Sequence, residues 1–321
     1  MAAGRAIVVE RDRGTRRLSA LPLPLRFQIG ARTLGSIQRN LVRVPLDLAD
    51  VLGGRLPMLP PLGDAADGYQ VTSLPAERQE AMGFVGSGMI AFVRQNYVRY
   101  YADLSIGYDR YLETLSGNAR NGLKRKTKKI AGLSGGTLDV RAFRTPGEMA
   151  GFHEVARGIS ARTYQEKLLG SGLPEDAGFV QRMYAMAAAD DVRAWLLYIG
   201  GEPAAYLYCP IHDGTVIYQF VGHDPAFGDL SPGSVLHLAA MRDLQDEGGL
   251  TRFDFTEGEG QHKRQLATGG VACVDLLLLR RSIANHATIV ALGTFDDCTA
   301  LAKAAVRKYG LGDLARKIRR A

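Results

Sequence analysis

The spacing of apolar positions changes several times along the chain and predicts a succession of helices and strands. Between about residues 108 and 133 apolar residues recur at helical intervals, which predicts an amphipathic helix with a basic opposite face. The run 137–143 alternates and predicts a strand. Residues 145–148, Thr-Pro-Gly-Glu, have the form of a capping box, so a helix should start there and extend to about Leu169.

Farther along, residues 192–221 predict an antiparallel meander. Three apolar runs, 192–199, 204–211 and 215–221, are separated by short Gly-containing turns. Flanking elements are expected as helices over 174–189 and 231–247, strands over 252–255 and 271–279, and a helical tail from about 286. The first 95 residues or so suggest short strands and loops. The pattern predicts an α+β protein whose mixed, mostly antiparallel sheet is flanked by helices.

The segment from Tyr218 to Lys263 predicts an anion site. It should form a strand, a loop rich in Gly, Ser and Pro, a helix, and a second strand that ends in acidic residues. Ser231 is a good N-cap, and Gly233 with Ser234 would leave room for a ligand beside the first backbone N–H groups. A helix start of this kind attracts phosphate. The alternative is a purely structural cap with nothing bound.

Composition indicates a soluble globular protein without a metal. The 321 residues exceed the usual size of one core, so two domains are expected. No stretch is apolar enough to span a membrane, and the charged first 17 residues do not fit a signal peptide, which predicts a cytoplasmic protein. The three Cys residues, 209, 273 and 298, are widely separated, and the six His show no ligand spacing, so no metal is expected.

The net charge of +7 is concentrated in two segments. Residues 120–129 hold six basic and no acidic residues, and residues 303–321 hold seven basic residues against Asp313. The remainder is mildly acidic. Localised positive charge favours an anionic partner such as a nucleotide, RNA or a lipid headgroup, although a solvated basic helix face and tail would look the same.

Several short motifs appear in an order that is more specific than any one of them. The motifs are SGNARNGLKRK at 116–126, Gly-Glu-Pro-Ala-Ala at 201–205, Gly-His-Asp-Pro at 222–225, Leu-Ser-Pro-Gly at 230–233, and Phe-Asp-Phe at 253–255 followed by Gly258 and Lys263. From about residue 97 to 281 this order resembles the GNAT-type acetyltransferases of the FemAB-like and CelD-like (cellulose and polysaccharide biosynthesis) group. One departure is that His262 precedes Lys263, where the group usually has Tyr.

The resemblance implies a GNAT fold around a splayed mixed sheet. By this reading residues 1–95 are a degenerate GNAT-like module, 96–285 the acyltransferase domain, and 286–321 a basic helical tail. The implied co-substrate is acetyl-CoA or another acyl-CoA, and the acceptor is an amine of a sugar, polysaccharide or cell-envelope precursor. Two alternatives stay open. One is aminoacyl transfer from tRNA to a cell-wall precursor, and the other is a non-catalytic accessory protein on the inner face of the membrane, held by the basic helix and tail.

Candidate site residues follow from the chemistry that acyl transfer needs. Ser231, Gly233 and Ser234 are candidates for binding the pyrophosphate of the cofactor. The resemblance implies that a main-chain N–H in Phe220, Val221 or Gly222 polarises the thioester carbonyl.

For the general base we expect Asp254 or Glu257. Asp254 lies between two Phe residues, a setting that would raise the pKa of its carboxyl, although it could also be a buried cap of a turn. Glu257 could equally be solvated. His223 is a third candidate, because histidine is the residue type suited to accept a proton near neutrality, although a lone turn His is more often solvated.

Lys263 could pair with a phosphate or a substrate carboxylate. Tyr218 and Tyr164 could donate a proton to the leaving thiolate or line the acceptor pocket, although aromatic residues on such elements are more often part of the core.

Overall fold

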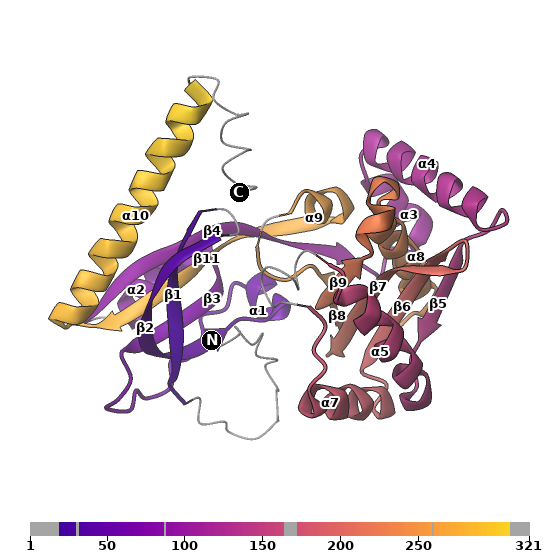
Figure 1. Ribbon diagram of the computed structural model, residues 1–321. Helices are drawn as coiled ribbons and strands as arrows, with labels where there is room; N and C mark the ends of the chain where they lie inside the picture. The colour runs from indigo at the N-terminus through magenta and orange to yellow at the C-terminus, as the bar shows by residue number, and fades with distance from the viewer. Residues whose placement is uncertain (1–18, 30–31, 87, 164–171, 259, 309–321) are drawn as a thin grey trace. The chain divides into compact units, whose positions relative to one another are not determined.

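The computed structural model describes residues 19–29, 32–86, 88–163, 172–258 and 260–308 (Figure 1). By its contacts the chain separates into two units. One comprises residues 97–271, and the other combines residues 11–96 with 272–321. Two long strands, β4 (Met89–Asp103) and β11 (Gly269–Arg280), each contribute residues to both units.

The unit formed by residues 97–271 is built on a mixed sheet. Its strand order is β4, β10 (Arg252–Asp254), β8 (Thr215–Ile217), β7 (Glu202–His212), β6 (Val192–Ile199) and β5 (Asp139–Phe143). A further strand, β9 (Phe220–His223), pairs with β7. Only the β10–β8 pair among these strands is parallel, so the predicted mostly antiparallel sheet is confirmed.

Helices cover both faces of this sheet. On one side lie α3 (Tyr108–Thr114), α4 (Gly117–Leu133) and α8 (Pro232–Glu247), and on the other α5 (Pro146–Ser160) and α7 (Ala177–Ala188) (Figure 1). Strand β7 contributes side chains to the hydrophobic core on each face of the sheet. Its side chains alternate, so that Leu207 and Cys209 pack under α8 whereas Tyr206 and Tyr208 pack under α5 and α7. The predicted α+β class is confirmed.

Two elements predicted as continuous are interrupted. The expected helix over 108–133 breaks at Ser116, whose side chain accepts a hydrogen bond from the Ala119 N–H at 3.2 Å and caps α4. The expected strand over 215–221 is divided into β8 and β9. Helix α5 begins with the predicted capping box and ends at Ser160, earlier than expected.

The division of β8 from β9 opens the sheet. Strand β8 pairs with the end of β7 and with β10, and the Tyr218 N–H donates to the Asp254 carbonyl at 2.9 Å. Beyond this point β9 continues along β7 only, within the described part of the chain. The far edge of β9 is therefore free of a neighbouring strand.

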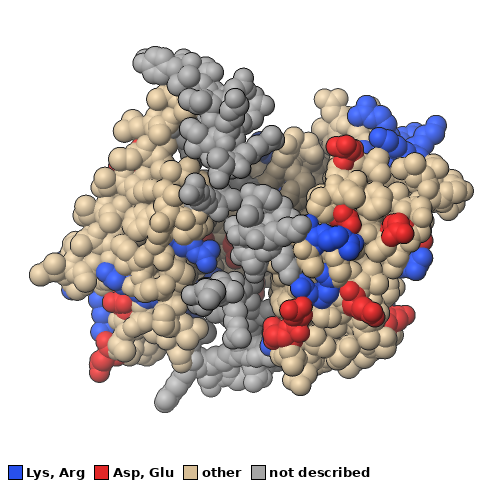
Figure 2. All heavy atoms as spheres, in the orientation of Figure 1, with Lys and Arg blue, Asp and Glu red and all other residues tan. Residues whose placement is uncertain are grey.

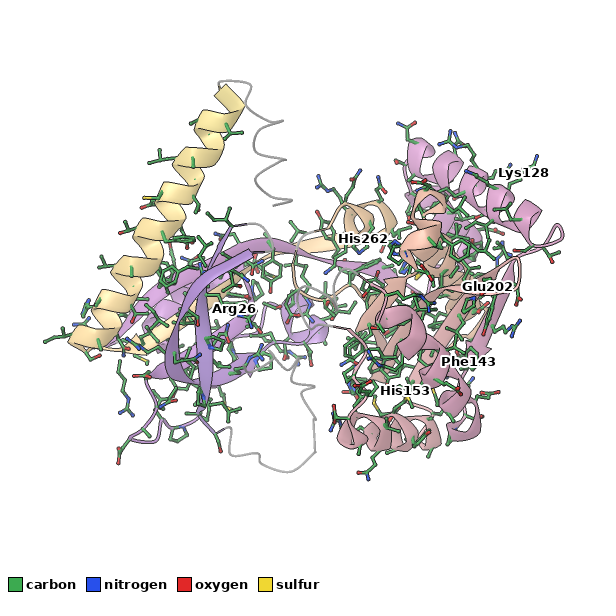
Figure 3. The ribbon with its side chains drawn as sticks, viewed as in Figure 1. Arg26, Lys128, Phe143, His153, Glu202 and His262 are labelled. Atoms are coloured by element: carbon green, nitrogen blue, oxygen red, sulfur yellow. The ribbon has the colours of Figure 1, made fainter. Side chains whose placement is uncertain are left out.

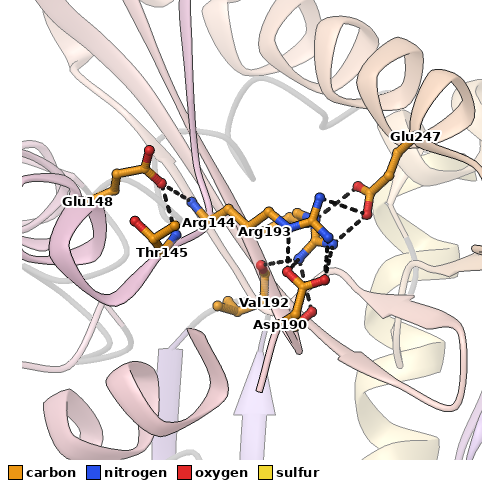
Figure 4. A network of polar contacts seen from close by, with 7 residues as sticks. All are labelled: Arg144, Thr145, Glu148, Asp190, Val192, Arg193 and Glu247. Atoms are coloured by element: carbon orange, nitrogen blue, oxygen red, sulfur yellow. Dashed lines mark hydrogen bonds and ion pairs between the residues drawn. The ribbon is translucent and has the colours of Figure 1, made fainter. Parts of the chain in front are cut away.

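A network of ion pairs ties β6 to the end of α8 (Figure 4). The buried Arg193 guanidinium donates from Nε to Glu247 Oε2 at 2.9 Å and from Nη1 to Asp190 Oδ1 at 3.0 Å. Arg144 pairs with the same two carboxylates. The Arg144 contact holds the pKa of Asp190 below its ordinary value. Four side chains thus fix the C-terminal end of α8 on the sheet.

The other unit has its own sheet and core. Strand β1 (Leu21–Ile29) is antiparallel to β2 (Arg32–Pro45), β2 is parallel to β3 (Gly68–Pro75), and β3 is antiparallel to β11. Its helices are α1 (Leu48–Leu52), the short η1 (Ala76–Arg78), α2 (Gln79–Val85) and α10 (Ile283–Lys308). Leu25, Leu41, Leu277, Leu279 and Leu292 form a buried cluster.

The sequence-based division at residues 95 and 285 stays a prediction, as does a degenerate module at the N-terminus. The structure groups residues 272–308 with the N-terminal strands. The last part of the predicted basic tail, residues 309–321, lies outside the described residues. Within the described residues, none of the helices combines the length and the apolar character that a membrane crossing requires.

Candidate active site

A cavity of about 530 Å³ opens where β9 separates from β8 and β10. Its wall is contributed by Tyr218, by the free-edge strand β9, by the loop and 3₁₀ turn η2 (Pro225–Leu230) that follow, by the first turn and a half of α8, and by helix α9 (Gln261–Leu266). All of these segments belong to residues 97–271. The segment that the sequence marked as an anion site therefore surrounds a real cavity.

The start of α8 is left open toward this cavity. Ser231 occupies the expected N-cap position, but it adopts a left-handed backbone conformation, with φ of 54°, and its side chain makes no capping hydrogen bond. A Cβ added to Gly233 would meet nothing within 4 Å. Helix α5 begins with the same Pro-Gly pair, but there the Glu148 carboxylate accepts from the Thr145 N–H at 2.9 Å. A side chain thus caps the start of α5, whereas the Ser231 side chain does not cap the start of α8.

Strand β9 presents backbone groups at its free edge. The Asp224 N–H donates to the Ala204 carbonyl of β7 at 2.9 Å. Because amide directions alternate along a strand, the N–H groups of Val221 and His223 point away from β7. Of the three residues predicted to polarise a carbonyl, Val221 has this direction. Phe220 is buried among aromatic rings, and Gly222 has no space for a side chain, since an added Cβ would lie 2.5 Å from Tyr206 Cε1.

Three rings line one end of the cavity. The Tyr218 ring lies 5.8 Å from the His237 ring and 5.9 Å from the His262 ring, measured between centroids. Burial raises the pKa of Tyr218. His237 is only 3% exposed, and neither of its ring nitrogens has a hydrogen-bond partner among the described residues. Burial, assisted by nearby His262, lowers the pKa of His237 to about 3, so its ring is neutral.

His262 differs from His237 because its side chain is exposed. Partial withdrawal from water, with a smaller contribution from the neighbouring Lys263 charge, lowers the pKa of His262 below its ordinary value. Its ring is therefore mostly neutral at pH 7. His262 lines the cavity and is labelled in Figure 3.

Comparison with known families agrees with this geometry. Residues 117–264 match the model of the acetyltransferase (GNAT) domain family. This segment is therefore similar to a GNAT domain. The match contains the cavity-lining β9, α8 and most of α9, and it includes the sequence motifs from the basic helix to Lys263. Membership in the FemAB-like or CelD-like group stays a prediction.

Solved structures give distant likenesses only. The C-terminal domain of a putative lysylphosphatidylglycerol synthetase from Agrobacterium fabrum has a TM-score of 0.49 at 10% identity, over 72% of each chain. FemX has a TM-score of 0.47 at 9% identity, over 81% of this chain and 88% of that chain. A GCN5-related N-acetyltransferase from Kribbella flavida has 0.37 at 14%, over 78% and 82%. Likenesses this remote transfer no substrate. The search of the curated proteins found no match.

Asp254, at the end of β10, is engaged in a buried ion pair. Its carboxylate is fully buried and accepts from Arg99 Nη2 at 2.6 Å and from Arg99 Nε at 3.1 Å. Oδ1 also accepts from the Thr256 N–H at 2.9 Å, which caps the turn after β10. Asp254 is not part of the cavity wall. This geometry favours the turn-capping interpretation over that of a free general base.

The other two charged candidates, Glu257 and Lys263, lie in and next to the segment before α9. Lys263 Nζ donates to the backbone carbonyls of Glu257 at 2.7 Å and Gly258 at 3.3 Å, and burial lowers the pKa of Lys263. The Glu257 side chain is exposed. Neither residue lines the cavity. Tyr164, the other tyrosine considered, lies outside the described residues.

Sequence reasoning missed His237, Thr163 and the place of His262 in the wall. His237 had a detectable signal, because it interrupts the buried face of α8 between Leu236 and Ala240. A polar residue at such a position needs an explanation. No group of three His, Cys, Asp or Glu side chains suited to a metal occurs in the described ranges.

Proposed function

We propose that the GNAT domain transfers an acyl group, most simply acetyl, from acyl-CoA to an amine. The observation that carries the proposal is the cavity between the open start of α8 and the free edge of β9. The start of α8 is suited to bind the phosphates of a ligand. The N–H groups at the edge of β9 are suited to polarise a carbonyl. In the described part of the cavity wall, α8 supplies a helix N-terminus and β9 supplies backbone amides that point away from β7.

Different residues of the cavity wall would bind different parts of acyl-CoA. The bound acyl-CoA would supply the activated thioester. The backbone N–H of Gly233, with the hydroxyls of Ser231 and Ser234, would hold the pyrophosphate. The open space beside Gly233 fits this role. The Ser234 N–H already donates to the Ser231 carbonyl at 3.1 Å. The Val221 N–H would donate to the carbonyl oxygen, where a preorganised donor is worth about 10² in rate.

We propose an acceptor that is an amino sugar or another hydroxyl-bearing amine, as in polysaccharide or cell-envelope precursors. Support comes from the wall near the expected thioester, where Tyr218, Thr163 and the histidines offer uncharged hydrogen-bonding groups. A cytoplasmic location, where acyl-CoA is made, is part of this proposal.

The proposal is tested by titrating the protein with acetyl-CoA in a calorimeter. We expect saturable binding that Gly233→Glu weakens at least about tenfold, since a carboxylate would fill the open space and repel phosphate. Gly147→Glu is the matched control, because Gly147 follows Pro146 at the start of α5 just as Gly233 follows Pro232. Absence of binding in the wild type, or equal loss in both variants, would contradict the proposal.

A second candidate, aminoacyl transfer from tRNA, is favoured by the surface of α4. Arg120, Lys124, Arg125, Lys128 and Lys129 are all exposed, and α4 contains no acidic residue. Figure 2 shows Lys and Arg gathered over this helix, and Figure 3 shows Lys128 pointing away from the domain. Contacts of Lys and Arg with phosphates give strongly salt-dependent binding.

Filter binding of bulk tRNA decides between the two candidates. The second candidate requires binding at low salt that is lost with rising salt and reduced by the double change Lys124→Gln with Lys128→Gln. Arg110→Gln on neighbouring α3 is the control, because Arg110 is exposed but paired with Glu113. If tRNA does not bind at low salt, this candidate is excluded and α4 is a solvated basic face.

A further inference from the structure

The cavity has an unusual set of titratable groups for an amine acyltransferase. Among the described residues that line it, none is Asp, Glu, Lys or Arg, and the titratable ones are Tyr218, His223, His237 and His262. An amine that attacks a carbonyl must lose a proton, and the acceptor must lie within hydrogen-bond reach. The proton acceptor in this wall must therefore be one of these four groups.

Two of the four are unsuited to accepting a proton. Tyr218 holds its proton because burial raises the pKa of its hydroxyl, so it can only donate near neutrality. His237 is neutral, but its buried ring has a pKa of about 3, so a protonated His237 would be strongly unfavourable. His223 and His262 remain, and both side chains are exposed.

Position separates these two histidines. His223 ends β9, beside the backbone groups that would bind phosphate and carbonyl. His262 lies on α9, a wall that supplies neither of those groups, and its ring packs 5.9 Å from the Tyr218 ring. An acceptor amine must approach from a side that the donor does not occupy. Of the two histidines, His262 lies on such a side.

The segment before α9 is held in place for this purpose. Lys263, next to His262, anchors the segment through its bonds to the Glu257 and Gly258 carbonyls. The Arg99–Asp254 pair fixes the end of β10, from which that segment starts. The position of His262 is therefore set by buried contacts even though its own side chain is exposed.

We infer that His262 is the catalytic proton acceptor of the GNAT domain. Its ring nitrogen takes the proton from the amine as the new C–N bond forms, and it returns this proton to the thiolate sulfur as the C–S bond breaks. Atoms and charges balance, because amine and thioester give amide and free thiol. The inference rests on the proposed acyl transfer and adds the residue that carries the proton.

The electrostatic surroundings support this role. The groups that lie near His262 are the Lys263 ammonium, the neutral His237 ring and the Tyr218 ring. The nearby positive charge and the partial withdrawal from water both keep the imidazole unprotonated at pH 7. No carboxylate of the described wall competes for the proton.

The test uses bromoacetyl-CoA on the full chain and needs no knowledge of the acceptor. A neutral imidazole beside the acyl group displaces bromide, which forms an N–C bond, breaks the C–Br bond and releases a proton to solvent. Mass spectrometry should locate the label on His262, and excess acetyl-CoA should prevent it. The labelling rate should rise with pH and reach half its maximum below pH 6.5, the ordinary pKa of His.

Variants separate failure of this inference from failure of the proposed function. His262→Gln should abolish labelling while acetyl-CoA binding, measured by calorimetry, stays within about twofold of the wild type. His212→Asn, an exposed turn histidine of the same unit, should be labelled like the wild type. Label on His223 or Tyr218, or no label despite acetyl-CoA binding, overturns the inference alone. Absence of acetyl-CoA binding overturns the proposed function. If His262→Gln does not fold, the labelled position in the wild type still decides.

Discussion

His237 is a single residue whose burial should make the stability of the protein depend on pH. Its pKa is about 3 in the folded state and about 6.5 in an unfolded chain. Between these values the unfolded chain binds a proton that the folded protein excludes, so stability falls as pH falls. The slope for one such group is about 1.4 kcal/mol per pH unit. We therefore expect a loss of about 2 kcal/mol from this residue between pH 7 and pH 5.

The measurement is urea unfolding at pH 7 and pH 5. In His237→Leu this part of the pH dependence should disappear, because the group that titrates in the unfolded chain is gone. His212→Leu is the control and should keep the dependence of the wild type, since His212 is exposed. Equal slopes for the wild type and His237→Leu would show that His237 is hydrated or partnered in the folded protein.

Asp254 forms a buried ion pair whose contribution to stability can be measured. Removing it in Asp254→Ala leaves the buried Arg99 without its ion-pair partner, which should cost about 3 to 5 kcal/mol of unfolding free energy. The double variant Arg99→Met with Asp254→Leu should recover much of this loss, because a buried pair can be replaced by apolar residues. Chemical denaturation of the three variants measures the coupling.

The same variants bear on the chemistry. If Asp254 has a structural role, the folded double variant still binds acetyl-CoA and still takes the bromoacetyl label on His262. If the double variant is stable and binds acetyl-CoA but is no longer labelled on His262, Asp254 has a role in the reaction. From the sequence, the two flanking Phe residues suggested an apolar setting, but Arg99 lies 155 positions away and no local pattern indicates it.

Among whole elements, the link between β6 and α8 should contribute most through Arg193. Its side chain is 7% exposed and bonded to both Asp190 and Glu247. Arg193→Met should lower the unfolding free energy by about 2 to 3 kcal/mol, since it removes charged hydrogen bonds from a buried position. Arg141→Met is the matched control, because the Arg141–Asp139 pair is exposed and should be worth less than about 1 kcal/mol. Equal losses, measured by urea unfolding, would contradict this ranking.

Local patterns predicted elements well where neighbours along the chain determine them. The capping box of α5 and the hairpin between β6 and β7 depend on a few adjacent residues, and both are present. The separation of β8 from β9 depends instead on β10, which pairs with β8 and not with β9. This separation creates the cavity, so the sequence indicated the helix start of α8 but not the aromatic end of the cavity.

At the scale of the whole molecule, the limits of the folding unit around the cavity can be tested. The family match starts at residue 117 and stops at 264, yet the site depends on contacts outside those limits. Arg99 holds Asp254, β4 pairs with β10 along residues 101–103, and the Tyr111 hydroxyl donates to the Leu266 carbonyl at 2.8 Å. A fragment of residues 97–271 keeps all three contacts, whereas a fragment of residues 117–264 lacks them.

We therefore expect the longer fragment to unfold cooperatively on heating and the shorter one not to, as followed by circular dichroism. The physical reason is that the shorter fragment exposes the edge of β10 and leaves the Asp254 carboxylate buried without a counter-charge, a loss comparable to the whole stability of a small domain. Arg99→Met in the longer fragment isolates the ion pair from the strand pairing. A shorter fragment that melts cooperatively at the same temperature would show that the matched segment alone contains the folding unit, and that β4 and Arg99 are additions to it.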